Sequence, residues 1–167
     1  IQAISVLVSV SKTKVITSAL SRRCRSEKDQ AVLRHLVSRL AKVKDPSVLK
    51  LVESLVKKGN REIRKASFKT LESLAGVFPG ETARVLTRFM SNPDEDVKKM
   101  AIHSARKCPS SSITKKLMRL AEQDASISIR IAAIDSLGIL AESSSKVLGF
   151  LERFGQSPRA EIRYAAV

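Results

Sequence analysis

Basic side chains at regular spacing are the residues of this chain best suited to chemistry, and that chemistry is anion binding. Arg34, Lys65 and Lys99 are separated by 31 and 34 residues, and other cations repeat nearly the same interval. Guanidinium and ammonium groups bind carboxylates and phosphates through charge-assisted hydrogen bonds. We therefore define a basic strip of candidate partner-binding residues: Arg34, Lys65, Lys69, Lys99, His103 and Arg106.

A second basic cluster consists of Arg22, Arg23 and Arg25. Its density is typical of a phosphate contact or of a short targeting signal. The cluster also falls where a helix is expected to end, and cations at that position are favoured by the helix dipole. The sequence leaves both interpretations open.

The charge of the chain points in the same direction. Lys and Arg number 31 against 16 acidic residues, which gives a net charge of +15. Residues 12–69 hold 17 basic and 5 acidic side chains (net +12), and the rest holds 14 and 11 (net +3). Such a field favours nucleic acid, an anionic membrane or an acidic protein as partner. The alternative is an ordinary solvated surface whose charge is balanced by segments outside this sequence.

Catalysis has no support in the sequence. There is no Gly-rich phosphate loop, nucleophile elbow, HExxH motif or pair of carboxylates at working spacing. His35, His103 and Asp135 stand alone, and Cys24 and Cys108 lack metal-ligand spacing. We expect a protein that is not an enzyme and holds no metal or cofactor. Reduced, buried thiols favour a reducing compartment, so we expect an intracellular location, cytoplasmic or nuclear.

The elements that position these residues are repeats. An aliphatic anchor is followed by a cation, and a small or apolar residue comes four positions after the anchor. The anchors Ile63, Val97, Ile129 and Ile162 are 34, 32 and 33 residues apart, and a degenerate copy opens at Val32. Self-similarity at this period predicts a stack of repeats in which no unit buries its apolar face alone.

Pro and Gly clusters divide each repeat into two helices. The expected first helices are 13–24, 46–58, 80–91, 111–123 and 144–156. The expected second helices are 28–43, 61–77, 95–108, 126–142 and 159–167. The fold class is therefore all-α, a right-handed alpha-alpha superhelix (solenoid) of about five helix pairs. No apolar run approaches the ~20 residues that span a bilayer, so no membrane span is expected.

We expect one array over residues 1–167, as a fragment of a longer chain. Residues 1–10 are expected to end a preceding repeat. The repeats are assigned roughly to 12–43, 46–77, 80–108, 111–142 and 144–167.

The repeats resemble the HEAT family. Asp94, Val97, Lys98 and Ala101 are similar to the second helix of a HEAT repeat, as are the Ile-Arg-x-Ala-Ala stretches at 129–133 and 162–166. The resemblance covers the chain from Lys12 onward. Armadillo repeats are a structural rival, but they need a third helix and ~40 residues per unit. Members of the HEAT family act as scaffolds, nucleic-acid binders, transport receptors and pigment lyases.

The resemblance also implies roles for individual positions. In HEAT stacks the second helices line the concave side, which would place the basic strip there. An acidic residue before the second helix and a cation within it form a polar ladder between repeats. The acidic or amide rungs would be Asp29, Asn60 and Asp94, and the cations Arg64, Lys98, Arg130 and Arg163. Ser126 and Arg159 replace the acid in the last two repeats, so the ladder should be incomplete there.

The sequence therefore predicts a non-catalytic scaffold that mediates protein–protein interaction through its concave surface. The partner is expected to be acidic or helical. The alternative is a nucleic-acid-binding module that uses the basic concave strip and the basic N-terminal third. The sequence leaves the oligomeric state open.

Overall fold

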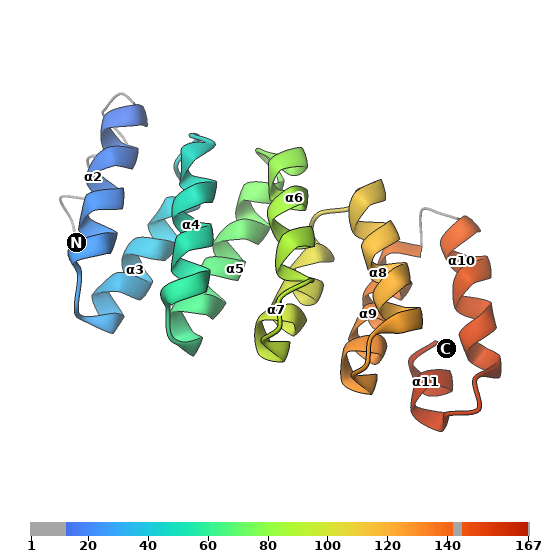
Figure 1. Ribbon diagram of the computed structural model, residues 1–167. Coiled ribbons are helices and arrows are strands. Elements are labelled where there is room, and N and C mark those ends of the chain that lie inside the picture. Colours follow the sequence, from blue (N-terminus) through green and yellow to red (C-terminus); the bar gives the residue numbers. More distant parts are fainter. Residues whose placement is uncertain (1–12, 142–144, 167) are drawn as a thin grey trace. The chain divides into compact units, whose positions relative to one another are not determined.

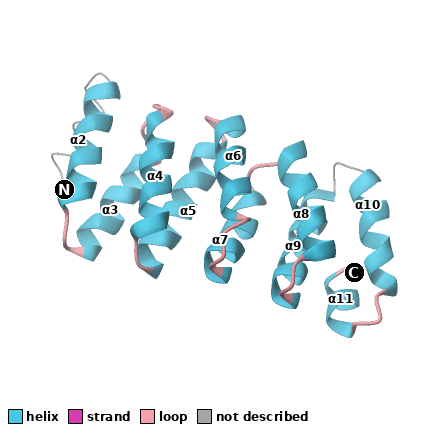
Figure 2. Cartoon of the chain, viewed as in Figure 1, coloured by secondary structure: helices cyan, strands magenta, loops and turns pink. Residues whose placement is uncertain are grey.

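The computed structural model describes residues 13–141 and 145–166, which are helical throughout apart from short connections (Figure 1). No strand occurs in these two ranges (Figure 2). The all-α prediction is confirmed. None of the helices in the described ranges is long and apolar enough to cross a bilayer. The helix expected in residues 1–10 lies outside the described residues.

The helices alternate between first and second members of each repeat. The first helices are α2 (Thr13–Ser26), α4 (Ser47–Lys58), α6 (Pro79–Phe89), α8 (Ser111–Gln123) and α10 (Ser145–Glu152), the last continued by the 3₁₀ helix η1 (Arg153–Gln156). The second helices are α3 (Gln30–Leu40), α5 (Arg61–Ala75), α7 (Glu95–Ala105), α9 (Ile127–Ala141) and α11 (Ala160–Ala165). Expected and observed ends agree to within a few residues.

Side-chain caps fix several helix starts. The carboxylate of Asp29 accepts from the backbone N–H groups of the first turn of α3, and Asp94 does the same for α7. The amide oxygen of Asn60 and the hydroxyl of Ser110 accept from the first turns of α5 and α8. Each cap satisfies an N–H that has no partner within its own helix.

The chain forms two compact units, residues 1–82 and 83–167. In the first unit, α2 packs against α3 and α4, and α5 packs against α3 and α4. The first helices α2 and α4 thus form one layer and the second helices α3 and α5 the other (Figure 1). In the second unit, α9 is the central element and contacts α7, α8, α10 and α11.

The core consists of the positions that the repeat pattern selects. The anchors Ile63, Val97, Ile129 and Ile162 are at most 2% exposed, whereas the degenerate anchor Val32 is half-buried. The small residues four positions later are also buried: Ser67, Ala101 and Ala133. Because residues four apart lie on one face of a helix, the pattern places both on the packed side. Small side chains there let neighbouring helices approach closely.

Buried hydroxyl groups join successive second helices within each unit. The hydroxyl of Thr70 on α5 lies 3.0 Å from the carbonyl oxygen of Val37 on α3. In the second unit, the hydroxyl of Ser136 on α9 lies 3.5 Å from the carbonyl oxygen of Ile102 on α7. Both hydroxyls occur seven positions after their anchors. These contacts hold α3 and α5 in register in the first unit, and α7 and α9 in register in the second.

Candidate functional site

An open groove runs between α3 and α5 in the first unit and has a volume of about 700 Å³. Three members of the basic strip line it: Arg34 from α3, and Lys65 and Lys69 from α5. All three side chains are exposed. The structure thus brings together the half of the basic strip that lies in residues 1–82, and we call this the α3–α5 groove.

Small residues give the α3–α5 groove its depth. Ala31, Ser38, Ala41, Ala66 and Ser73 line it between the cations. None of these side chains is long enough to fill the space between the two helices. A partner side chain that enters the groove therefore meets apolar methyl and methylene groups below and positive charge around it.

The groove also contains two residues that sequence reasoning did not assign to it. Glu62 lies 3.1 Å from the Nζ of Lys65, and both side chains are about half exposed, so the pair contributes little stability and is accessible to a competing anion. His35 lines the groove, and its Nε2 accepts a hydrogen bond of 3.2 Å from the Nε of Arg39. The sequence contained a signal for both residues. Glu62 lies three residues before Lys65, and His35 follows Arg34 and lies four residues before Arg39, which are spacings at which helical side chains meet.

The other half of the basic strip lies on α7 and at its C-terminal cap, Arg106, in the second unit. His103 is exposed, whereas Lys99 and Arg106 are half-buried. The Nζ of Lys99 lies 3.1 Å from Glu95, and the Nε of Arg106 donates to the hydroxyl of Ser136 at 3.0 Å. Arg106 thus links the end of α7 to α9, whereas Lys99 pairs within its own helix and keeps 41% of its side chain exposed. Glu95 lies four residues before Lys99, a spacing that predicts pairing on a helix, but no signal in the sequence indicated Ser136 as the partner of Arg106.

The cations directly after the anchors brace the repeats. Three of them donate to backbone oxygens at helix ends of their own repeats: Arg64 to Val56 (3.2 Å), Arg130 to Ala121 (2.9 Å) and Arg163 to Ser157 (2.7 Å). The fourth, Lys98, forms an ion pair with a neighbouring repeat. Last-turn carbonyl oxygens lack partners within their helix, so these contacts satisfy groups that would otherwise be orphaned. The contacts favour bracing over partner binding for this column.

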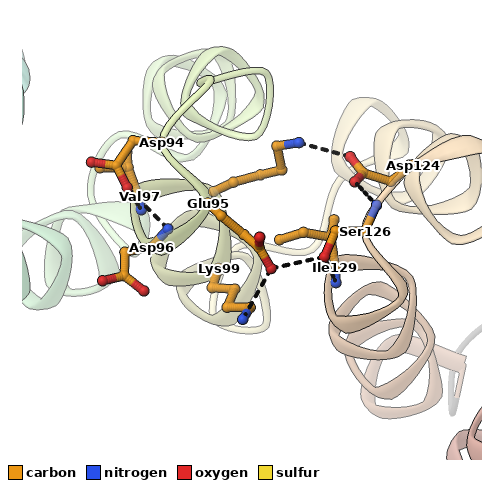
Figure 3. Close-up of polar contacts among 9 residues, drawn as sticks. Asp94, Glu95, Asp96, Val97, Lys99, Asp124, Ser126 and Ile129 are labelled. Atoms are coloured by element: carbon orange, nitrogen blue, oxygen red, sulfur yellow. Dashed lines mark hydrogen bonds and ion pairs between the residues drawn. The ribbon is translucent and has the colours of Figure 1, made fainter.

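At the α7–α9 joint, polar side chains link neighbouring repeats by a route that the sequence pattern did not predict (Figure 3). Lys98 pairs with Asp124 at 2.8 Å, two residues before the expected rung at Ser126. The hydroxyl of Ser126 instead donates to Glu95 at 2.8 Å, and Lys99 approaches the same carboxylate. The ladder is thus complete at this joint, although Ser126 replaces the acid.

The carboxyl groups of this joint have lowered pKa values. The pKa of Glu95 is lowered mainly by the hydrogen bond from Ser126, and then by Lys99. Burial acts in the opposite direction on Asp124, but the hydrogen bonds from Lys98 and from the backbone N–H of Ser126 leave the pKa of Asp124 below its ordinary value. Both groups are therefore held as anions by their partners.

The second basic cluster occupies the last turns of α2. Arg22, Arg23 and Arg25 are all exposed. Arg23 pairs with Glu27, and Arg22 and Arg25 line a separate hollow on α2. The position at a helix end agrees with the dipole interpretation for Arg23.

The part of the chain that the structure describes contains neither a reactive thiol nor a cluster of metal ligands. Cys24 and Cys108 are buried free thiols. Burial raises the pKa of Cys24 to about 11 and also raises the pKa of Cys108. Because the thiolate is the reactive form, both groups are poor nucleophiles in the folded protein. No cluster of three or more His, Cys, Asp or Glu side chains suited to a metal occurs among the described residues.

Comparison with known proteins places these features in a family. A sequence model of HEAT repeats matches residues 82–167, just over half of the chain. No curated protein sequence matches significantly. An engineered protein of known structure is 16% identical over 98% of this chain and 84% of its own, with a TM-score of 0.52. A designed armadillo repeat protein is 15% identical over 99% of this chain and 83% of its own, also with a TM-score of 0.52.

Likeness at these identities shows the fold alone, and that fold is a helical repeat scaffold. Scaffolds of this kind commonly mediate protein interaction and are generally not catalytic. The shared fold, the family match and the buried anchors together support one assignment. The chain belongs to the HEAT repeat family.

Proposed function

We propose that this chain is a non-catalytic scaffold that binds an acidic segment of a protein partner along its second helices. The observation that carries the proposal is the α3–α5 groove, in which Arg34, Lys65 and Lys69 are exposed around a lining of small residues. Glu62, the acidic residue of this lining, is paired with Lys65. The groove therefore presents net positive charge to a ligand.

A helical segment fits this groove best. Lys65 and Lys69 are four residues apart on α5 and thus lie ~6 Å apart along the helix axis. Two acidic residues at the same spacing on a partner helix present their carboxylates at a matching distance. A helix that lies in a groove between two helices also buries its apolar face against the small residues.

Nucleic acid is the second candidate ligand of the basic strip, and the net charge of +12 on residues 12–69 favours it. When binding is through phosphates, affinity falls steeply as salt rises, and the slope of log K against log salt is roughly proportional to the number of phosphates neutralised. An acidic peptide bound in the groove also uses apolar contacts, which salt does not weaken. The salt dependence of binding therefore separates the two candidates.

The test uses a charge-reversed groove and a matched control. Arg34→Glu, Lys65→Glu and Lys69→Glu change the net charge by six, and so do Lys42→Glu, Lys44→Glu and Lys58→Glu. The control cations are exposed, belong to the same unit and do not line the α3–α5 groove. Binding of a Glu-rich helical peptide is measured by fluorescence anisotropy, and circular dichroism verifies that both variants are folded.

We expect the groove variant to lose more than tenfold in affinity for the acidic peptide, and the control variant to lose less than threefold, because the control side chains do not line the groove and salt screens exposed charges that make no direct contact. Equal losses would mean that the charge acts as a general field without a site. Loss of nucleic-acid binding in the groove variant, with peptide binding absent in the unmodified protein, would favour the second candidate.

A further inference from the structure

A second groove lies on the first helices of the same unit, between α2 and α4. It has a volume of about 470 Å³. It shares Ser18, Ser21 and Arg25 with an adjoining hollow of about 540 Å³ at the end of α2. None of its lining residues lines the α3–α5 groove. We call this surface the α2–α4 groove, and it is separate from the site proposed above.

Hydroxyl groups and cations face this groove from both helices. On α2, Ser18, Ser21 and Arg25 follow one another at intervals of three and four residues. On α4, Lys50 and Ser54 are four residues apart. These intervals place each set along one face of its helix. The groove is therefore walled on both sides by hydrogen-bond donors and positive charge.

The acidic residue in the lining is already engaged. The carboxylate of Asp45 accepts from the hydroxyl of Thr17 at 3.0 Å, and from the backbone N–H and hydroxyl of Ser47 at 2.9 and 2.7 Å. These bonds fix the start of α4 against α2. Arg22, Arg25 and Lys50 are exposed, and their three positive charges outnumber the single negative charge of Asp45.

We propose that the α2–α4 groove binds the phosphodiester backbone of a nucleic-acid duplex without regard to base sequence. Arg, Lys and Ser side chains are the usual partners of phosphate oxygens. No aromatic side chain lines the groove, so unstacked bases of a single strand have no platform. Ser18 to Arg25 spans ~10 Å of helix. One strand of a duplex presents about three phosphates over that length, at 3.4 Å each. The cations available to contact them are Arg22 and Arg25 on α2 and Lys50 on α4.

The test measures binding of a short mixed-sequence DNA duplex as a function of salt. Each phosphate contact contributes about 0.9 to the slope of log K against log salt. Three contacts give a slope of about −2.7, which is roughly a 40-fold loss of affinity between 50 and 200 mM salt. Replacing Arg22, Arg25 and Lys50 by Gln should make the slope less steep by about two to three. Replacing Lys42, Lys44 and Lys58 by Gln removes the same charge outside the groove and should change the slope by less than one.

A charge-preserving variant provides a second readout. Ser18→Ala combined with Ser21→Ala should lower duplex affinity several-fold and leave the slope unchanged, because hydroxyl contacts release no counterions. Circular dichroism verifies folding of every variant. A slope that changes equally in the cation variant and its control would overturn the proposal, as would failure of the unmodified protein to bind duplex at low salt.

The outcome is distinguishable from that of the α3–α5 groove. Substitutions at Arg34, Lys65 and Lys69 should weaken the acidic peptide and leave the slope for duplex within one of the unmodified value. If these substitutions, rather than those at Arg22, Arg25 and Lys50, remove duplex binding, the phosphate site is misplaced and the present inference fails. Loss of peptide binding alone, with the duplex slope intact, would leave this inference standing.

Discussion

The ion pair at the α7–α9 joint offers a sharp test of how these repeats are stabilised. Lys98 and Asp124 lie 2.8 Å apart, and their side chains are only 18% and 9% exposed. Lys98→Met removes the charge and keeps most of the aliphatic chain. Asp124 then retains the hydrogen bond from the backbone N–H of Ser126 and the weaker influence of Lys116, but loses its ion-pair partner.

The expected loss is about 2 kcal/mol in the free energy of unfolding near neutral pH. An exposed ion pair is worth at most about 1 kcal/mol. A hydrogen bond to a charged group that is largely removed from water is worth about 1.5–3 kcal/mol. The low exposure of both side chains places this pair in the second class.

The loss should depend on pH in a defined direction. In the unmodified protein the pKa of Asp124 is lowered, so its contribution to stability is present above the unfolded pKa and is lost as pH falls through the folded pKa. Burial is the largest single influence on this group and raises its pKa, so removal of Lys98 shifts the folded pKa upward. The difference between the two proteins must therefore shrink as pH falls between the two folded pKa values, in the acidic range where Asp titrates.

Urea denaturation followed by circular dichroism measures both quantities. Asp124→Asn alone, and together with Lys98→Met, completes a double-mutant cycle that isolates the pair. We expect an interaction energy of about 1–2 kcal/mol near neutral pH that declines as the pH falls through the folded pKa of Asp124. An interaction energy below about 0.3 kcal/mol at neutral pH, which is within the additivity error of such cycles, would refute the reasoning. A loss that does not change with pH would do the same.

Three further predictions follow from burial. Ala101→Asp places an unpaired carboxylate at a fully buried position and should cost several kcal/mol in urea denaturation, whereas Ala101→Ser should cost much less. Thr70→Val removes the hydrogen bond to Val37 and should cost about 1 kcal/mol by the same measurement, with no change in helix content. Cys24 and Cys108 should react with a thiol reagent at neutral pH far more slowly in the folded protein than in urea, since burial raises the pKa of each; fast reaction in the folded state would contradict their placement.

The repeat architecture could be predicted from the sequence because its signal is local. The anchors Ile63, Val97 and Ile129 recur at one helical-repeat period, and Asp94 marks a helix start by its capping chemistry. Helix formation and the choice of buried face depend on residues within a few positions of one another. Nearly all helix boundaries and the buried anchors therefore followed from the order of residues alone.

The exceptions in the core have a physical cause. The sequence also places an apolar residue eight positions before each anchor and predicts that it is buried, yet Leu55 and Phe154 at this position are half-exposed. The pattern identifies which side of a helix packs inward, but the extent of burial depends on how closely the neighbouring helices cover that side. That distance is set by the side chains of other repeats.

The role of each cation was decided only by tertiary structure. The sequence treats Lys65, Lys99 and Arg106 alike, as cations at similar repeat positions. In the folded protein Lys65 lines an open groove, whereas Arg106 is bonded to Ser136, which is 30 residues away in the chain. Likewise, Lys98 meets Asp124 because packing of α7 against α9 brings them to 2.8 Å. Charge and helical face are properties of the local sequence, but a partner within hydrogen-bonding distance exists only once the helices have packed.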